Sequence, residues 1–192
     1  MKIPATAILV SRDQADADMV LGNLLDKFEE VLFWNNETGP ADLKVFGRYA
    51  LAATTKYTTI YFQDDDCLVD VEKLWLCYGE DRGAPLCNMP EEHRAKYPDG
   101  IALVGFGCFT DLWTIRRAFS PYLAKYPIDE LFLIECDRVF TALAPHSLAL
   151  ADVPMHHLAN ARLPTSLYRR PDHASRLAEI RRRIAIVKGA GQ

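Results

Sequence analysis

Three consecutive aspartates, Asp64, Asp65 and Asp66, follow an apolar run that ends in Gln63. Adjacent carboxylates repel one another and aspartate is a poor strand former, so this run is costly unless something relieves the charge. A bound cation would relieve it. Ligands that offer only oxygen suit Mg²⁺, Mn²⁺ or Ca²⁺, and such ions commonly bind one or two carboxylates together with substrate phosphates. The alternative is a solvated acidic turn or a helix cap that holds no ligand.

The hydrophobic pattern indicates the elements that must position these aspartates. Continuous apolar or β-branched runs predict strands, whereas apolar residues that recur every three or four positions predict helices. We expect strands at residues 5–10, 30–34, 58–63, 101–104 and 147–151. We expect helices at residues 14–28, 46–57, 71–78, 112–119, 129–143 and 174–187. Strands that alternate with helices predict an α/β fold with an open, mostly parallel sheet and helices on both faces, as in Rossmann-like nucleotide-binding proteins.

The predicted sheet would bring several polar positions to one edge. Open α/β sheets bind ligands at the carboxyl ends of their strands, and Ser11, Asn35, Asp64 and Gly105 each follow a predicted strand. We therefore expect these residues to lie along the same edge. Segment 79–100 holds glycine, proline, asparagine and aspartate with little periodicity. It is typical of a lid or an acceptor loop.

The composition is that of an ordinary globular protein. Of the 192 residues, 49% are hydrophobic and 25% are charged, which is enough to build a core. The formal net charge of −4 gives no general attraction for nucleic acid. The five cysteines form no C-x-x-C pair, and the N-terminal apolar run is too short to span a membrane and lacks a secretory pattern. We expect a cytoplasmic protein with no membrane span and no nucleic-acid partner.

The aspartate run, with its place in the chain, resembles the nucleotide-sugar glycosyltransferases of the GT-A fold. In that family a strand ends in an Asp-x-Asp motif, and residues 59–66 look like that element, after the third strand of a β-α-β-α-β series. In order of elements the resemblance covers residues 4–158 and is to small bacterial or bacteriophage-like members. It implies that Asp66 is a metal ligand, that Asp64 contacts the metal or the ribose, and that Asp65 assists. Mn²⁺ or Mg²⁺ would then bridge the donor diphosphate and neutralise the departing nucleoside diphosphate.

The same resemblance implies a further metal ligand and a catalytic base. Family members often take a ligand from a late histidine, and we assign His156 rather than His157, although adjacent residues of an extended segment face opposite ways. Inverting members often carry the general base in a Glu-Asp motif at the start of a helix. Here a cysteine separates Glu135 from Asp137, and residues two apart do not share a helix face, so we assign Asp137 as the base with Glu135 behind it. The alternatives are packed or surface histidines, and acids that only pair with a basic neighbour such as Arg138.

The remaining candidates would hold the donor. Gly105-Phe106-Gly107 would let the backbone approach a sugar diphosphate, with the Phe106 ring against a sugar face, or it forms a tight turn without a ligand. Positions after the first strands, or at a helix start, add Ser11, Arg12, Asn35 and Arg48, beside Asp64 and Asp65. Arg48 resembles the basic residue that many family members aim at the nucleotide. For each of these the alternative is a solvated polar side chain, and a solvated helix face is the favoured interpretation of Arg169-Arg170 and of the basic residues 181–183.

These features predict a nucleotide-sugar-binding catalytic domain over residues 1–160 and a C-terminal tail over residues 161–192, whose basic amphipathic helix packs on it. The predicted activity is metal-dependent transfer of a sugar from a nucleoside diphosphate sugar to an undetermined acceptor, which could be a glycan, a protein or a lipid-linked molecule. A nucleotidyltransferase shares such a sheet and acidic site. It usually needs a glycine-rich phosphate loop after its first strand, and residues 11–14 contain no glycine. A catalytically silent GT-A-like binding module is a third alternative.

Overall fold

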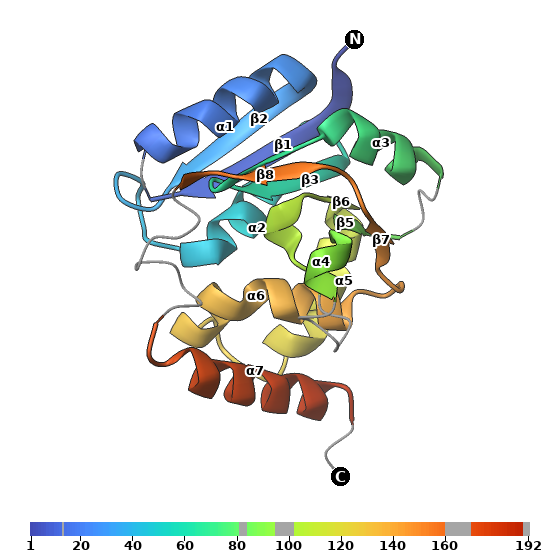
Figure 1. The fold of residues 1–192 in the computed structure, drawn as a ribbon. Helices are drawn as coiled ribbons and strands as arrows, with labels where there is room; N and C mark the ends of the chain where they lie inside the picture. Colours follow the sequence, from blue (N-terminus) through green and yellow to red (C-terminus); the bar gives the residue numbers. More distant parts are fainter. Residues whose placement is uncertain (13, 81–83, 95–101, 160–169, 190–192) are drawn as a thin grey trace.

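A six-stranded sheet forms the centre of the protein in the computed structural model, which describes residues 1–12, 14–80, 84–94, 102–159 and 170–189 (Figure 1). The sheet has the order β2-β1-β3-β6-β5-β7 and comprises β1 (Ile3–Ser11), β2 (Phe28–Asn35), β3 (Thr59–Asp64), β5 (Leu86–Asn88), β6 (Cys108–Asp111) and β7 (Ala149–Ala151). All neighbouring pairs are parallel except those made by β6, which is antiparallel to both β3 and β5. The sheet is therefore mostly parallel, with β6 reversed.

A short antiparallel pair stands beside the main sheet. It joins β4 (Cys67–Val69), which begins just after the aspartate run, to β8 (Met155–His157). The pairing brings a segment from late in the chain next to the end of β3, so the second half of the protein contributes to this edge.

Helices cover both faces of the sheet (Figure 1). On one face lie α1 (Gln14–Lys27) and α3 (Val71–Glu80), and on the other lie α2 (Gly47–Ala52), α5 (Leu112–Leu123) and α6 (Glu130–Leu143). The last helix, α7 (His173–Val187), packs under α6 and α5 on the side away from the sheet. Single turns complete the described fold: η1 (Lys44–Phe46), α4 (Glu91–Arg94) and η2 (Val104–Phe106).

Side chains of the central strands alternate between two hydrophobic cores. In β3, Ile60 and Phe62 enter the core beneath α2, α5 and α6, whereas Tyr61 enters the core beneath α1 and α3. In β1, Ile8 lies in the first of these cores and Leu9 in the second. Because strand side chains alternate between faces, burial on both faces produces the continuous apolar runs from which the strands were predicted.

Two predictions about the middle of the chain are wrong. The strand predicted at residues 101–104 is absent: Val104 begins η2, Ile101 lies outside the described residues, and the strand is β6, Cys108–Asp111. Segment 79–100 was predicted as a lid or acceptor loop; its residues 81–83 and 95–100 lie outside the described residues, and its described part supplies the interior strand β5, with Leu86–Asn88 buried between β6 and β7. A strand of three residues is too short to show a periodicity, and only its partners reveal it.

The other predicted elements are confirmed with shifted ends. The helix expected at residues 46–57 is divided into η1 and α2 and stops at Ala52. It ends there as the hydroxyls of Thr54 and Thr55 donate hydrogen bonds to the carbonyls of Leu51 and Ala52, at 2.9 and 3.2 Å. Such local bonds compete with helix continuation. No helix among the described residues is long and apolar enough to cross a lipid bilayer.

Candidate functional site at the carboxyl edge of the sheet

Each of the three aspartates is held by a different element. Asp64 is the last residue of β3, where it pairs in register with Val10, and its Oδ1 forms an ion pair with Arg48 of α2. Ser11, at the end of β1, donates its hydroxyl to the Asp65 carboxylate. The Asp66 carbonyl accepts a hydrogen bond from the Leu158 N–H at 2.7 Å, just after β8. The turn after β3 is thereby tied to both sheets.

The Asp66 side chain is the least satisfied group of the cluster. Its Oδ1 is buried and has no hydrogen-bond partner among the described residues. Burial, followed by the nearby charges of Asp64 and Asp65, raises the pKa of Asp66 to about 7. Burying an unpaired carboxylate is unfavourable, so this position gains from a proton or from a cation.

Arg48 connects the aspartate run to α6. Its side chain is only 3% exposed, and the guanidinium lies between two carboxylates: Nη2 pairs with Asp64, and Nη1 is 3.5 Å from Oδ2 of Asp137. Burial alone would lower the pKa of Arg48, but the charges of Asp137 and Asp64 outweigh burial and raise it. Arg48 therefore stays charged, and the structure brings Asp137 to the same edge as Asp64.

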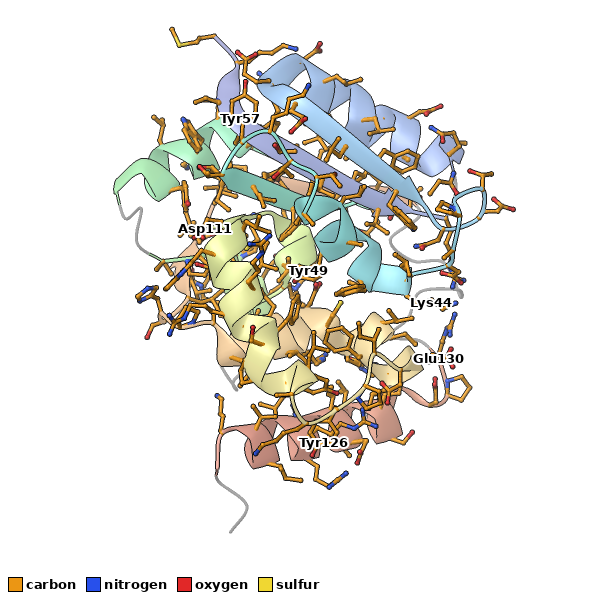
Figure 2. The ribbon with its side chains drawn as sticks, turned by 180° about the vertical axis from the view of Figure 1, so that it is seen from behind. Lys44, Tyr49, Tyr57, Asp111, Tyr126 and Glu130 are labelled. Atoms are coloured by element: carbon orange, nitrogen blue, oxygen red, sulfur yellow. The ribbon has the colours of Figure 1, made fainter. Side chains whose placement is uncertain are left out.

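Tyr49, the neighbour of Arg48, completes this arrangement. Its hydroxyl donates a hydrogen bond of 2.8 Å to Oδ1 of Asp137, 88 positions away in the sequence. Its ring packs edge-on against Phe62 and Phe119, in the middle of the protein between α2 and the helices beneath the sheet (Figure 2). Tyr49 was not among the predicted site residues, because a tyrosine in an alanine-rich helix gives no sign of a partner so far along the chain.

Asp137 is partly accessible despite these contacts. Its side chain is 24% exposed. Burial, opposed by Arg48 and reinforced by Asp64, raises the pKa of Asp137 above its ordinary value. A carboxylate that holds protons more tightly than usual, and that still has a path to solvent, is suited to accept a proton.

Glu135 has a different environment. Its side chain is 7% exposed and pairs with Nε of Arg138 at 2.8 Å and with Nε of Arg176 at 3.2 Å. The prediction that Glu135 stands behind Asp137 as a second catalytic acid gains no support from this placement, since both of its carboxylate oxygens are engaged by arginines. The weaker alternative, an acid that pairs with Arg138, describes the observed contact.

The glycine turn at residues 105–107 lies beside Asp64, but it precedes a strand instead of following one. Gly105 was predicted to follow a strand, but it lies in η2, which precedes β6. Because β6 runs antiparallel to β3, its beginning lies beside the carboxyl end of β3. A Cβ at position 105 would overlap the Asp64 carboxylate, so any larger residue there must displace that side chain. Gly107 has φ of 101°, which explains this glycine by backbone conformation.

Phe106 and the histidines form an aromatic cluster next to this turn. The Phe106 ring lies 5.0 Å from the ring of His93 on α4 and 5.3 Å from the ring of His157 on β8. His157 pairs with Cys67 and His156 with Leu68, and adjacent strand residues face opposite sides. The histidine on the Phe106 side is therefore His157, and the assignment of His156 as a metal ligand stays a prediction.

The two remaining donor-binding candidates hold the loop that follows β2. The Asn35 side chain accepts hydrogen bonds from the backbone N–H groups of Glu37 and Thr38, at 2.8 and 3.0 Å, as in an Asx turn. Arg12 is exposed and pairs with Asp42 at 3.3 Å. Asn36, which the sequence analysis did not select, accepts the Trp34 indole N–H at 3.1 Å. Of these two neighbouring asparagines, only Asn35 was among the predicted donor-binding residues.

Comparisons with known proteins do not assign a family. No family model matches the chain, and no curated protein sequence matches it. Among solved structures, A197 from STIV is similar with a TM-score of 0.45 and 14% identity, over 81% of this chain and 86% of that chain. The chemistry of the site therefore has to follow from the residues of this chain.

Proposed function

We propose that this protein is a metal-dependent glycosyltransferase that takes its sugar from a nucleoside diphosphate donor. The observation that carries this proposal is the buried oxygen of Asp66 that finds no hydrogen-bond partner in the described part of the chain, in a run of three aspartates at the carboxyl edge of the sheet. Open α/β sheets bind ligands at that edge. A cation at Asp66 would satisfy the orphan oxygen and offset the repulsion among the carboxylates.

The donor atoms suit Mn²⁺ or Mg²⁺. Carboxylate oxygens are hard ligands, and these ions often keep part of their coordination for substrate phosphates and water. Among the described residues, no three side chains of His, Cys, Asp or Glu are already grouped to hold a metal, so the donor diphosphate is expected to supply ligands. The bound ion would act as a Lewis acid that stabilises charge on the departing diphosphate.

Two neighbouring features hold Asp64 in place. The bare backbone of Gly105 lies directly against the Asp64 carboxylate, which fills the space that a side chain at position 105 would need. Arg48 holds Asp64 in one orientation from within the fold. The side chains of the cluster are thus fixed before a ligand arrives, and binding does not have to order them.

Asp137 is the proposed general base. It is the partly exposed carboxylate beside Arg48, and its raised pKa brings it closer to the range useful for proton transfer near neutral pH. It would accept the proton of the acceptor hydroxyl as that oxygen attacks the anomeric carbon of the sugar. The bond to the nucleoside diphosphate then breaks, and the diphosphate leaves.

Thermal shift and donor hydrolysis together test the proposal. Mn²⁺ with UDP, GDP or dTDP should raise the melting temperature more than the ion or the nucleotide alone, because a ligand that binds only the folded state stabilises it. UDP-, GDP- and dTDP-sugars should then release nucleoside diphosphate in Mn²⁺, and Asp66→Asn should abolish both effects. The absence of a shift with every nucleotide, in both Mn²⁺ and Mg²⁺, would overturn the proposal.

The same assays separate the alternatives. Pyrophosphate release from a nucleoside triphosphate and a sugar phosphate would indicate a nucleotidyltransferase. Saturable binding of a nucleotide sugar, with neither hydrolysis nor transfer to an added glycan, would indicate a silent binding module.

A further inference from the structure

Helix α6 is bent just before the residue that it delivers to the site. Glu135 has φ of −104° and ψ of 15° inside α6, away from helical values, and Asp137 follows two residues later. The direction of the helix after this bend sets where the Asp137 carboxylate lies relative to α2. The geometry at Glu135 is therefore part of the geometry at Asp137.

An arginine from the last helix pairs with the carboxylate at the bend. Arg176 of α7 is 8% exposed, and its Nε donates to Oε1 of Glu135 at 3.2 Å. The other oxygen, Oε2, accepts from Arg138 one helical turn further along α6, at 2.8 Å. Asp172, at the start of α7, forms an ion pair with Arg176. The buried carboxylate at the bend is thus clamped from two helices.

The attachment of α7 does not depend on this ion pair alone. Ile180 and Ile184 of α7 enter the same hydrophobic core as Tyr49 and Phe132. Arg183 anchors the helix separately, through a 2.7 Å ion pair with Asp129. Helix packing and the clamp on Glu135 are therefore separable by mutation, although one strongly buried charge without its partner is costly.

The other end of this short path is the contact between α6 and α2. Asp137 meets Tyr49 at 2.8 Å and Arg48 at 3.5 Å, and a small rotation of α6 would break the first contact and change the second. We infer that Arg176 is a positioning residue: through Glu135 it fixes the bend in α6 and thereby holds the Asp137 carboxylate against α2. Its catalytic consequence rests on the proposed function, in which Asp137 is the base.

The first test follows the placement of Asp137 and needs no substrate. In protein labelled with ¹³C at the aspartate carboxyl groups, the Asp137 resonance is assigned by its absence in Asp137→Asn. Its chemical shift and titration midpoint should change in Arg176→Gln and return toward the native values in Arg176→Lys, which keeps the charge. Arg182→Gln is the matched control, because Arg182 is 58% exposed and pairs with Glu179 on its own helix.

The second test measures catalysis. Misplacement of a reacting group by about 1 Å can cost up to about 100-fold, so kcat should fall by about 10- to 100-fold in Arg176→Gln, with the donor KM within about twofold of wild type. In the Asp137→Asn background the same change should add no further loss. Arg182→Gln should leave both constants unchanged.

The outcomes distinguish this inference from the proposed function. A native Asp137 resonance in folded Arg176→Gln, or losses in kcat that multiply with those of Asp137→Asn, would overturn the inference. If Arg176→Gln does not fold, Glu135→Gln, which removes the charge that Arg176 contacts, is compared with wild type instead, and a native Asp137 resonance together with native kcat in that variant would overturn the inference. If no donor is hydrolysed by the wild type, the proposed function fails, whereas the resonance of Asp137 still decides the placement.

Discussion

Removing the Asp66 charge should stabilise the metal-free protein at alkaline pH. The folded protein raises the pKa of Asp66 from 3.8 to about 7, so the folded state holds this proton to higher pH than the unfolded chain does. Below about pH 4 the group is protonated in both states. As pH rises from about 4 to 7 the unfolded chain releases its proton first, and the free energy of unfolding falls. Above pH 7 the cost of the buried charge is complete.

The size of this effect follows from the same shift. A difference of about three pKa units corresponds to about 4 kcal/mol at 1.36 kcal/mol per unit, as an upper bound. Partial access to water reduces the penalty, so about 2 kcal/mol is a reasonable expectation. For a chain of this length 1 kcal/mol moves the melting temperature by roughly 2–4 °C. Asp66→Asn should therefore melt about 4–8 °C higher than wild type at pH 8, and close to wild type near pH 4.

The assay is thermal unfolding in EDTA across this pH range. Each variant is compared with wild type at the same pH, which cancels the titration of groups shared by both proteins. Asp152→Asn provides the control, because it removes one negative charge at an exposed position outside the cluster. If the gain from Asp66→Asn is no larger at pH 8 than at pH 4, or if Asp152→Asn reproduces it, the account of Asp66 as a buried unpaired carboxylate is refuted. In Mn²⁺ wild type should melt at a higher temperature than Asp66→Asn, since only wild type binds the ion.

Three further substitutions probe the contacts around this centre. Asp137→Asn should preserve donor binding and lower transfer by about 10²–10⁴-fold, the range for a positioned proton transfer; an unimpaired rate with a lower melting temperature would make Asp137 structural. Gly105→Ala should push the Asp64 carboxylate aside and weaken the stabilisation by Mn²⁺ and nucleotide; an unchanged thermal shift would contradict the close approach of position 105 to Asp64. Tyr49→Phe should cost about 1–3 kcal/mol in urea unfolding through the lost hydrogen bond to a carboxylate, whereas Tyr57→Phe, just before β3 at the far end of the sheet from the aspartates, should cost less (Figure 2).

Local sequence patterns were sufficient to predict an element wherever that element is long and buried. The strands predicted at residues 5–10 and 58–63 lie within or nearly coincide with β1 and β3, because side chains on both faces enter hydrophobic cores and leave continuous apolar runs. The short interior strands β5 and β6 were not predicted, since three or four residues are fewer than any periodic pattern needs. The reversed direction of β6 was not predicted either, because it depends on pairing with a strand far away in the chain.

The candidate site divides in a similar way. The triple aspartate was recognisable as a candidate site from the sequence, because three adjacent carboxylates repel one another in any fold. Which of His156 and His157 lies beside Phe106 could not be predicted, because that depends on which face of β8 meets Phe106. The sequence predicts that Glu135 and Asp137 face different ways, but only the structure shows that Glu135 meets the arginines and that Asp137 meets Tyr49.

By itself, the sequence determined the α/β class, the long strands and helices, and a concentration of negative charge at the end of β3. These depend on composition, periodicity and neighbours along the chain, which are local properties. Only the tertiary structure decided that an oxygen of Asp66 is buried without a partner among the residues described, that Arg48 joins Asp64 to Asp137, and that Arg176 reaches Glu135. Each of these depends on burial and on contacts between distant segments. The free energy of a charge is set by the groups that replace its water, and packing alone brings those groups together.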